Sequence, residues 1–366
     1  MENCIIWVGL DVHKLTIQAC WARGSALEDE ECQLANDEKS IRKLFKRLQK
    51  EGEVRACYEA GPCGYVVRRL LTKMGIHCDV IVPSMIPRKS GDRVKTDRRD
   101  ARKLMRYYRM GELTVIRIPS EEEEGVRALL RCREDLLEDL HRQRQRLLKM
   151  LNLHGRRWEA TAHWSQKHWA WLRTQKFDQE SWQRTFDEYL QQVAQTCDRL
   201  STMDDEVNQL AEKDSWKENV RLLCCLKGFK PLTAMTVLAE IQDFRRFESP
   251  RQLMSFLGMT PTLYSSASTR HQGAITKAGN AHARRVLIEA AWHYRHRPQL
   301  AGTLRQRCKG QSAAVLATAT KAQHRLNTRF RRLIAKGKQP NVTVVAVARE
   351  LAGFVWALMV EKKSKS

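Results

Sequence analysis

The sequence predicts a mixed α/β sheet domain followed by two helical parts, and three observations carry this prediction. Within residues 1–120, short runs rich in β-branched and aromatic residues come first as hairpin strands and then alternate with amphipathic segments. Over residues 121–215, leucines recur at a heptad-like spacing. Residues 216–366 combine helical periodicity with a strong excess of lysine and arginine.

Composition limits the class of protein. The chain has 366 residues, enough for two or three domains, and its 42% hydrophobic content supplies real cores. A net charge of +23 indicates a polyanionic partner such as nucleic acid. We find no run of about 18 apolar residues and no basic signal-peptide start, so we expect a cytoplasmic protein with no membrane partner. The eleven cysteines form no CxxC pair, which argues against a zinc site or a disulfide scaffold.

The first part of the chain is expected to contain five strands and three helices. Hairpin strands are expected at residues 5–10, 16–21 and 31–34, with Gly24-Ser25 at a turn. An amphipathic helix over 39–50 precedes a strand over 54–59, which Gly61-Pro62 ends. A helix over 65–74, a strand over 77–82 and a helix over 96–110 complete the domain.

Four carboxylates fall where such a sheet would bring them to one edge. Asp11 follows the first strand and Glu59 ends the fourth, while Asp97 and Asp100 share one face of the helix over 96–110. Three or four carboxylates are what two Mg²⁺ ions about 4 Å apart need for phosphoryl transfer. The alternative is that Asp97 and Asp100 only reduce the positive charge of a basic segment, because residues 86–109 hold ten Lys/Arg and three acids.

Basic residues beside these acids are candidates for contacts with nucleic acid. His13 and Lys14 follow Asp11, and each either contacts a phosphate or faces solvent at the end of a strand; for His13 we favour solvent. On the predicted helix the candidates are Arg98, Arg99 and Arg102.

The middle of the chain is expected to form a helical hairpin. Apolar residues at helical spacing over 126–151 and again over 190–210 predict two helices that pack against each other. Between them lie five tryptophans and three histidines beside basic residues. This segment either forms a small core at the hairpin tip, the interpretation we favour, or stacks on unpaired bases of RNA or single-stranded DNA.

The last third is a very basic module. Residues 222–234 have the pattern helix, glycine-containing turn, helix, which presents backbone N–H groups to a phosphate or serves packing alone. Residues 264–280 are expected to be a loop rich in hydroxyl groups, in which a serine could attack phosphorus. Residues 270–340 hold sixteen Lys/Arg and one acid, Glu289. The expected phosphate contacts are Arg270, Lys277, Arg284, Arg285, Arg295, Arg297, Arg325, Arg329, Arg331 and Arg332.

Several motifs together resemble one protein family. They are Gly9-Leu10-Asp11-Val12-His13-Lys14, Glu59-Ala60, Lys95-Thr96-Asp97-Arg98-Arg99-Asp100-Ala101, Tyr264-Ser265-Ser266, Ile275-Thr276-Lys277-Ala278-Gly279-Asn280 and residues 347–354. In this order they are similar to the DEDD-motif insertion-sequence transposases, which are bridge-RNA-guided recombinases with pilin-gene invertases as relatives. The resemblance covers nearly the whole chain.

The resemblance implies a fold and a set of site residues. It implies a RuvC-like RNase H-fold domain over 1–120, a coiled-coil linker over 121–215 and a mainly α-helical transposase domain with a serine nucleophile over 216–366. The metal ligands it implies are Asp11, Glu59, Asp97 and Asp100. By position Ser266 is the implied nucleophile and Ser265 the reserve, although Ala267 and Ser268 stand where the family most often has two glycines.

The resemblance also implies an activity and partners. Mg²⁺ on the four carboxylates would polarise the scissile phosphate while Ser266 attacks it, giving a phosphoserine link to target or donor DNA. A noncoding bridge RNA would guide a homo-oligomer, a dimer or tetramer. Two rivals remain open at this point: a metal-dependent nuclease or Holliday-junction resolvase that uses activated water, and a non-enzymatic nucleic-acid-binding protein.

Overall fold

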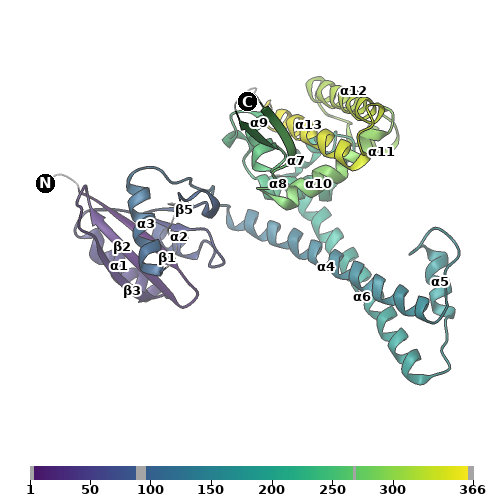
Figure 1. Cartoon of the computed structure of the whole chain (residues 1–366), viewed down its shortest axis with the longest axis horizontal. Coiled ribbons are helices and arrows are strands. Elements are labelled where there is room, and N and C mark those ends of the chain that lie inside the picture. The colour runs from purple at the N-terminus through teal and green to yellow at the C-terminus, as the bar shows by residue number, and fades with distance from the viewer. Residues whose placement is uncertain (1–3, 88–95, 267–268, 362–366) are drawn as a thin grey trace. The chain divides into compact units, whose positions relative to one another are not determined.

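The structure is a computed structural model that describes residues 4–87, 96–266 and 269–361, with the backbone alone described for residues 265–266, 269–271 and 361. It comprises two compact units, Met1–Pro119 and Ser120–Ser366 (Figure 1). Lys95 of the Lys95-Thr96-Asp97 motif, like Ala267 and Ser268 between the two hairpin strands, lies outside the described residues.

A five-stranded sheet with the order β3-β2-β1-β4-β5 forms the first unit. The strands β1 (Ile5–Val12), β2 (Thr16–Arg23) and β3 (Glu30–Ala35) pair antiparallel, and β4 (Glu53–Glu59) and β5 (His77–Ile81) continue the sheet parallel to β1. Parallel neighbours need a crossover, which α1 (Glu38–Gln49) and α2 (Val66–Lys73) supply. The predicted mixed α/β sheet is confirmed, and its topology fits an RNase H-like domain.

Helices cover both faces of this sheet. On one face α1 and α2 pack against the even-numbered residues of β1, and the resulting core includes Ile6, Val8, Leu10, Ile41, Phe45, Leu48, Val67 and Leu71. The other face is covered by α3 (Asp97–Arg109), whose Ala101 and Met105 cluster with Cys20 of β2. A short 3₁₀ turn, η1 (Pro83–Met85), follows β5.

The contact between β1 and α3 is very close, and a glycine permits it. A Cβ atom added to Gly9 would lie 2.3 Å from the carbonyl oxygen of Ala101 and 2.4 Å from the amide nitrogen of Met105. Both neighbours are helix backbone, which cannot rotate away. Any side chain at Gly9 would therefore push α3 off the sheet.

Two long helices open the second unit. In α4 (Glu121–Leu153), Ser120 caps the first turn by a reciprocal capping box with Glu123. Helix α4 packs beside α6 (Glu180–Ala211) (Figure 1). The buried side chains shared by the two helices include Leu140, Leu147, Leu151, Phe186, Val193 and Leu200. The predicted helical pair is present; a coiled-coil supercoil remains a prediction.

The tryptophan-rich segment forms a small core at the tip of this helical hairpin. The short helix α5 (Gln166–Thr174) buries His168 and Leu172 completely, and Trp164, Trp169 and Trp171 pack against the same cluster. The predicted small core at the hairpin tip is therefore present.

The remaining helices build the core of the second unit around two apolar helices. These are α8 (Pro231–Ile241) and α13 (Pro340–Glu361), and the surrounding elements are α7 (Asp214–Leu223), η2 (Phe244–Arg246), α9 (Pro250–Phe256), α10 (Ala281–Ala291), η3 (Trp292–Arg295), α11 (Gly302–Arg307) and α12 (Ala313–Ala335). By length and composition α13 could cross a membrane, but Val347, Leu351 and Val355 are completely buried in this core. The contacts of α13 are thus those of a core helix.

The glycine-containing turn before α8 serves packing. Gly228 has a φ of +88°, and an added Cβ would lie 2.4 Å from the carbonyl oxygen of Ala290 in α10. Because this turn is pressed against α10, the packing interpretation accounts for the glycine without a phosphate.

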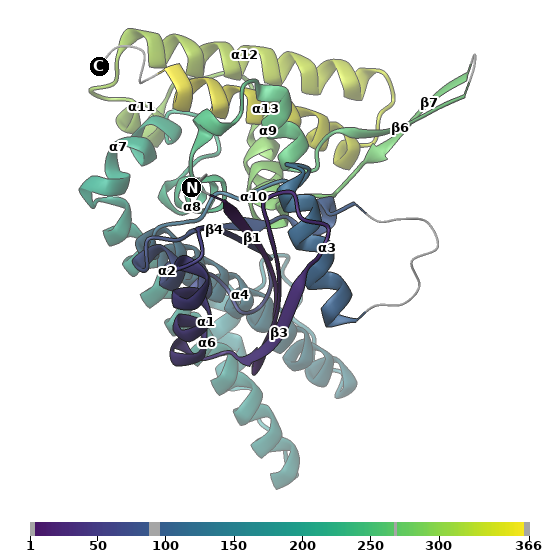
Figure 2. The ribbon, with the colours of Figure 1, turned by 90° about the vertical axis from the view of Figure 1, so that its left-hand side faces the viewer.

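The hydroxyl-rich stretch that we expected to be a loop is instead a β-hairpin, so that expectation is wrong. The strands β6 (Pro261–Ser266) and β7 (Thr269–Ile275) pair antiparallel, with Tyr264 opposite His271 and Ser266 opposite Thr269. Figure 2 shows this hairpin extending beyond the helices of its unit. The β-branched and aromatic residues in the stretch favour strand pairing over a loop.

Two carboxylates, the buried Glu240 and the half-buried Glu134, fasten α4 to the rest of its unit. Glu240 of α8 accepts two hydrogen bonds from Arg131 of α4, at 2.7 and 2.9 Å, and one from Asn280 at 2.7 Å. Glu134 of α4 accepts from Arg285 of α10 at 2.6 Å. Burial raises the pKa of Glu240, but the bonds from Arg131 and Asn280 outweigh it, so the pKa lies below its usual value.

We predict that Gly9→Ala destabilises the first unit by about 1–3 kcal/mol, because the added methyl group overlaps the backbone of α3. Urea unfolding followed by circular dichroism measures this loss. The matched control is Gly125→Ala in α4, where an added Cβ meets nothing within 4 Å and helix propensity favours alanine. Equal stability of Gly9→Ala and the wild type would show that α3 does not depend on this contact.

Candidate active site

The close approach of α3 to β1 brings acids from two elements together. Asp97 lies one helical turn before Ala101, the residue that contacts Gly9, so its side chain projects from the same face of α3. Asp11 follows Gly9 by two residues on β1 and therefore points to the same face of the sheet. The contact at Gly9 thus sets the distance between these two carboxylates.

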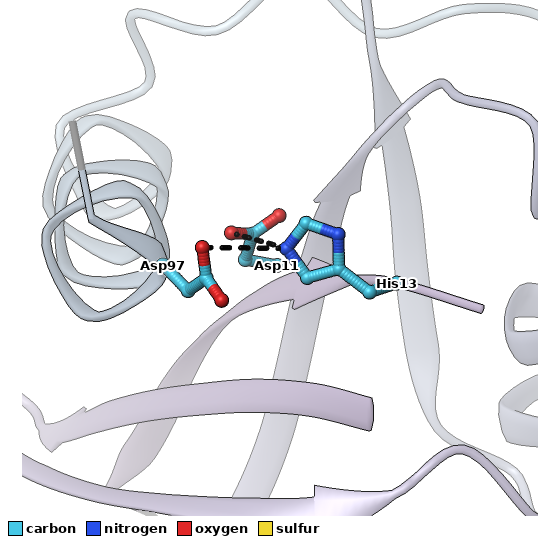
Figure 3. A group of neighbouring side chains, drawn as sticks. All are labelled: Asp11, His13 and Asp97. Atoms are coloured by element: carbon cyan, nitrogen blue, oxygen red, sulfur yellow. Dashed lines mark hydrogen bonds and ion pairs between the residues drawn. The ribbon is translucent and has the colours of Figure 1, made fainter. Parts of the chain in front are cut away.

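Asp11, His13 and Asp97 form one compact group (Figure 3). The Nε2 atom of His13 lies 3.2 Å from Asp11 Oδ2 and 3.5 Å from Asp97 Oδ1. One potential ligand atom from each residue lies within 4.8 Å of the others. The side chain of Asp11 is 19% exposed, whereas those of His13 and Asp97 are half exposed. The group is therefore anchored in the fold on one side and open to solvent on the other.

The surroundings of Asp11 disfavour the ionised form of its carboxyl group. Burial is the largest cause that raises its pKa above the ordinary value, and the charges of Asp97 and Asp100 raise it further, while His13 acts in the opposite direction. The net shift is upward, because burial outweighs the interaction with His13. A divalent cation beside these carboxylates would favour their ionised form, and carboxylate oxygens are the ligands that Mg²⁺ prefers.

Glu59 reaches the same edge of the sheet by strand register. In the parallel pair of β1 and β4, Gly9 pairs with Cys57 and Leu10 with Tyr58, so Asp11 and Glu59 come next along their strands. Paired residues of parallel strands point to the same face, which here is the face under α3. Glu59 is exposed and lies outside the compact group formed by Asp11, His13 and Asp97.

His13 is the residue of this group that the sequence interpretation placed in solvent. Its side chain is half exposed, as expected, but its Nε2 atom also lies within 3.5 Å of the carboxylates of both Asp11 and Asp97. No local pattern identifies this contact, because His13 follows the end of β1 and Asp97 is distant in the sequence.

The arginines of α3 have partners within their own unit. Arg102 donates to Asp29 at 2.9 Å and to Glu31 at 3.3 Å, and Arg98 also pairs with Glu31. These ion pairs hold the outer side of α3 against the β2–β3 edge of the sheet. Lys14 and Arg99 are exposed.

In the second unit, Ser265 and Ser266 end strand β6. Ser265 pairs with Arg270, and Ser266 with Thr269. The base of the hairpin is fastened by backbone hydrogen bonds from Lys277 to Gly258 at 3.0 Å and from Asn280 to Phe256 at 3.1 Å, with Asn280 also capping α10. The side chains of the serines and of Arg270 lie outside what the structure describes.

The basic residues expected to contact phosphate differ in their surroundings. Arg325 and Arg329 of α12 both pair with Glu350, at 2.9 and 3.3 Å. Arg284 donates to the carbonyl oxygen of Leu257, and Arg285 is shared between Glu134 and Glu289. Among the described residues, the basic side chains that are exposed and have no hydrogen-bond or ion-pair partner include Lys277, Arg331 and Arg332.

At neutral pH and without metal, we expect Asp11→Asn to unfold at a higher temperature than the wild type. A raised carboxyl pKa means that the folded protein disfavours the ionised form, so the wild type loses stability as the pH rises from the unfolded-state pKa through the higher folded-state pKa. The asparagine variant cannot ionise and escapes this loss.

Thermal unfolding in chelator across the acidic to neutral range measures the difference. The gap between Asp11→Asn and wild type should open as the pH rises and close at the acidic end. Asp178→Asn, at an exposed position of the other unit, is the control for loss of a carboxylate. A variant less stable than wild type at neutral pH would contradict the expected charge imbalance.

Comparison with known proteins agrees with this arrangement. A DEDD transposase domain family of the IS110 type matches residues 8–155, and the family described as transposase IS116/IS110/IS902 matches residues 220–305. The first match includes all four predicted carboxylates, and the second includes the β6–β7 hairpin.

Two full-length relatives extend this similarity over most of the chain. The transposase homologue y4qE of Sinorhizobium fredii is 38% identical over 98% of this chain and 89% of its own length. The transposase for insertion sequence element IS1533 of Leptospira borgpetersenii is 36% identical over 91% of this chain and 98% of its own length. The chain therefore belongs to the IS110 family of insertion-sequence transposases, enzymes that cut DNA and that carry a DEDD domain.

Proposed function

We propose that this transposase cuts and rejoins DNA with a serine nucleophile and a site for two Mg²⁺ ions. The observation that supports the proposal most directly is the group at the start of α3, in which ligand atoms of Asp11, His13 and Asp97 lie within 4.8 Å of one another. Such a concentration of negative charge in a basic protein suits a divalent cation.

Asp11, Glu59, Asp97 and Asp100 are the proposed metal ligands. When bound, Mg²⁺ would neutralise charge on the scissile phosphate and polarise it toward attack. The close contact of Gly9 in β1 with the backbone of α3 holds Asp11 and Asp97 near each other. A metal site needs ligands that are positioned in this way before the metal binds. The Nε2 atom of His13 lies within 3.5 Å of both carboxylates and could serve as a further ligand.

Ser266 is the proposed nucleophile, with Ser265 as the reserve. In the cutting step, the serine oxygen forms a bond to phosphorus, the serine proton passes to solvent, and the bond from phosphorus to one DNA oxygen breaks. The released DNA oxygen takes up a proton and becomes a hydroxyl. Rejoining reverses these changes with a different DNA hydroxyl, and the phosphoserine ester conserves the bond energy in between.

The hairpin of the second unit supports this role for the serines. Its base is fixed by the backbone bonds at Lys277 and Asn280, while its far end, near Ser266, extends beyond the helices (Figure 2). A rigid base with a projecting tip suits a nucleophile that must reach a phosphate. The four carboxylates belong to the first unit, and Ser266 belongs to the second.

A guiding noncoding RNA and assembly as a homotetramer complete the proposal. The net charge of +23 supports a second polyanion besides DNA. Sequencing the RNA that copurifies with the protein tests this part, because its unpaired loops should match the DNA ends that are joined. RNA of random sequence would contradict it.

Ser266→Ala should abolish the covalent protein–DNA adduct and lower strand exchange about 1,000-fold or more, because no other step supplies the serine oxygen. The measurement is denaturing electrophoresis of the protein with labelled element ends. Ser265→Ala is the matched control and should retain the adduct.

Asp97→Asn and Asp100→Asn should lose both adduct and strand exchange while remaining folded. Cleavage by Ser266→Ala without any adduct would instead favour the nuclease or junction-resolvase alternative, in which water is the nucleophile. Recombination that persists in the aspartate variants would exclude the proposed metal site.

We also predict that Arg331→Ala combined with Arg332→Ala weakens DNA binding similarly for all sequences and lowers the slope of log affinity against log salt by about 2, because each phosphate contact releases about one counterion. Arg325→Ala combined with Arg329→Ala is the matched comparison and should change the slope less, since Glu350 already pairs with both. A change in target preference would contradict a phosphate role for Arg331 and Arg332.

A further inference from the structure

The tip of the α4–α6 hairpin carries an open groove of about 360 Å³ between the end of α4 and the tryptophan-rich segment. Its lining includes Lys149, Arg156, Arg157, Trp158, His163 and Trp171. No acidic residue lines it. The groove belongs entirely to the second unit, and the metal and serine residues discussed above do not contribute to it.

The basic residues of the groove divide into one that builds it and two that face outward. Arg156 donates to Gln175 at 3.3 Å and lies over the ring of Phe177 at 4.0 Å, so it joins the loop to α5 and fixes the wall. Lys149 is exposed and has no ion-pair or hydrogen-bond partner in the described part of the chain. Arg157 is exposed, and only its Nε is held, by Asn152 at 3.2 Å.

The surrounding charge is strongly one-sided. Residues 141–176 contain nine Lys/Arg and a single acid, Glu159. The basic residues are Arg142, Arg144, Arg146, Lys149, Arg156, Arg157, Lys167, Arg173 and Lys176. An internal role in packing would not require so many exposed cations, whereas a phosphate backbone along the tip would pair with them.

The aromatic side chains are arranged as a platform. Trp158 and Trp171 have ring centroids 5.6 Å apart, and Trp171 stacks on the buried ring of His168 at 5.6 Å with an interplanar angle of 15°. Trp158 and Trp171 are both partly exposed where they line the groove. Rings held from behind by a buried ring offer a stacking surface that loses little conformational entropy on binding.

We propose that this tip groove binds an unpaired nucleotide of a single-stranded nucleic acid, with the base against Trp158 and Trp171 and the phosphate beside Lys149 and Arg157. A positively charged groove with aromatic platforms is the arrangement that binds single strands. The groove is small and lies at the lower end of ligand-site volumes, so it admits a base that is already unstacked but not a duplex.

The test uses the full-length protein and fluorescent oligouridine RNA, oligothymidine DNA and a blunt DNA duplex, with binding followed by anisotropy at physiological salt. We expect Lys149→Ala combined with Arg157→Ala to weaken single-strand binding about tenfold. The matched control is Lys167→Ala combined with Arg173→Ala, which removes two exposed cations of α5 that do not line the groove. This control, and duplex binding by either variant, should change less than about twofold.

A second measurement locates the base. Oligonucleotides containing 5-iodouracil should crosslink on irradiation to Trp158, His163 or Trp171, as mapped by mass spectrometry of the peptides. Trp158→Leu should remove the crosslink at that position, and its thermal unfolding shows whether the tip core is intact. If that variant does not fold, the alanine pairs at exposed positions still carry the test.

The outcomes separate the possible ligands. Equal loss for RNA and DNA supports recognition of base and phosphate, and loss for RNA alone supports an RNA ligand read through its 2′-hydroxyl. Equal weakening by both alanine pairs, equal weakening for the duplex, or crosslinks only outside residues 149–171 would overturn the proposal. The proposal concerns the tip alone and does not depend on the identity of the metal or of the nucleophile.

Discussion

The N-terminal site depends on one steric constraint, the absence of a side chain at Gly9. Because the backbone of α3 rests directly on β1, the first turn of α3 is held over the end of β1, and Asp97 and Asp100 come to Asp11. A methyl group at this position would separate the helix from the sheet and the carboxylates from each other. The contact between Gly9 and α3 therefore both packs the helix on the sheet and brings Asp97 and Asp100 near Asp11. The favourable packing of α3 offsets the repulsion between these carboxylates.

Much of this unit could be predicted from local patterns. Strand ends at Asp11 and Glu59 and the three-residue spacing of Asp97 and Asp100 are short-range features, and periodicity identifies them. The position of His13 could not be predicted in this way. Its environment is created by Asp97, which is 84 positions later in the sequence, and a pattern of alternation shows which face a residue uses but not which helix covers that face.

The second unit shows the same limit at larger scale. Residues 264–280 have the serine, threonine and glycine content of a loop, yet Tyr264 and its neighbours find partners across β7 and form a hairpin. Composition alone does not report strand pairing, because the cross-strand partner supplies the stability. From the sequence, the glycine turn before α8 could either bind a phosphate or serve packing. The structure shows that Gly228 is needed for packing, because its backbone lies against the carbonyl of Ala290 on another helix.

Which basic residues can bind a polyanion becomes clear only when the ion pairs within the fold are known. Arg131 is committed to Glu240, Arg285 to Glu134, and Arg102 to Asp29, so these cations stabilise the fold as well as adding to the net charge. Sequence counts cannot separate them from arginines available to a polyanion, because their acids lie 73 to 151 positions away. At the hairpin tip, residues 141–176 contain nine Lys/Arg and one acid, and the exposed cations Lys149 and Arg157 line a groove with Trp158 and Trp171. Where folding leaves such a surplus, a phosphate backbone is the partner with matching charge.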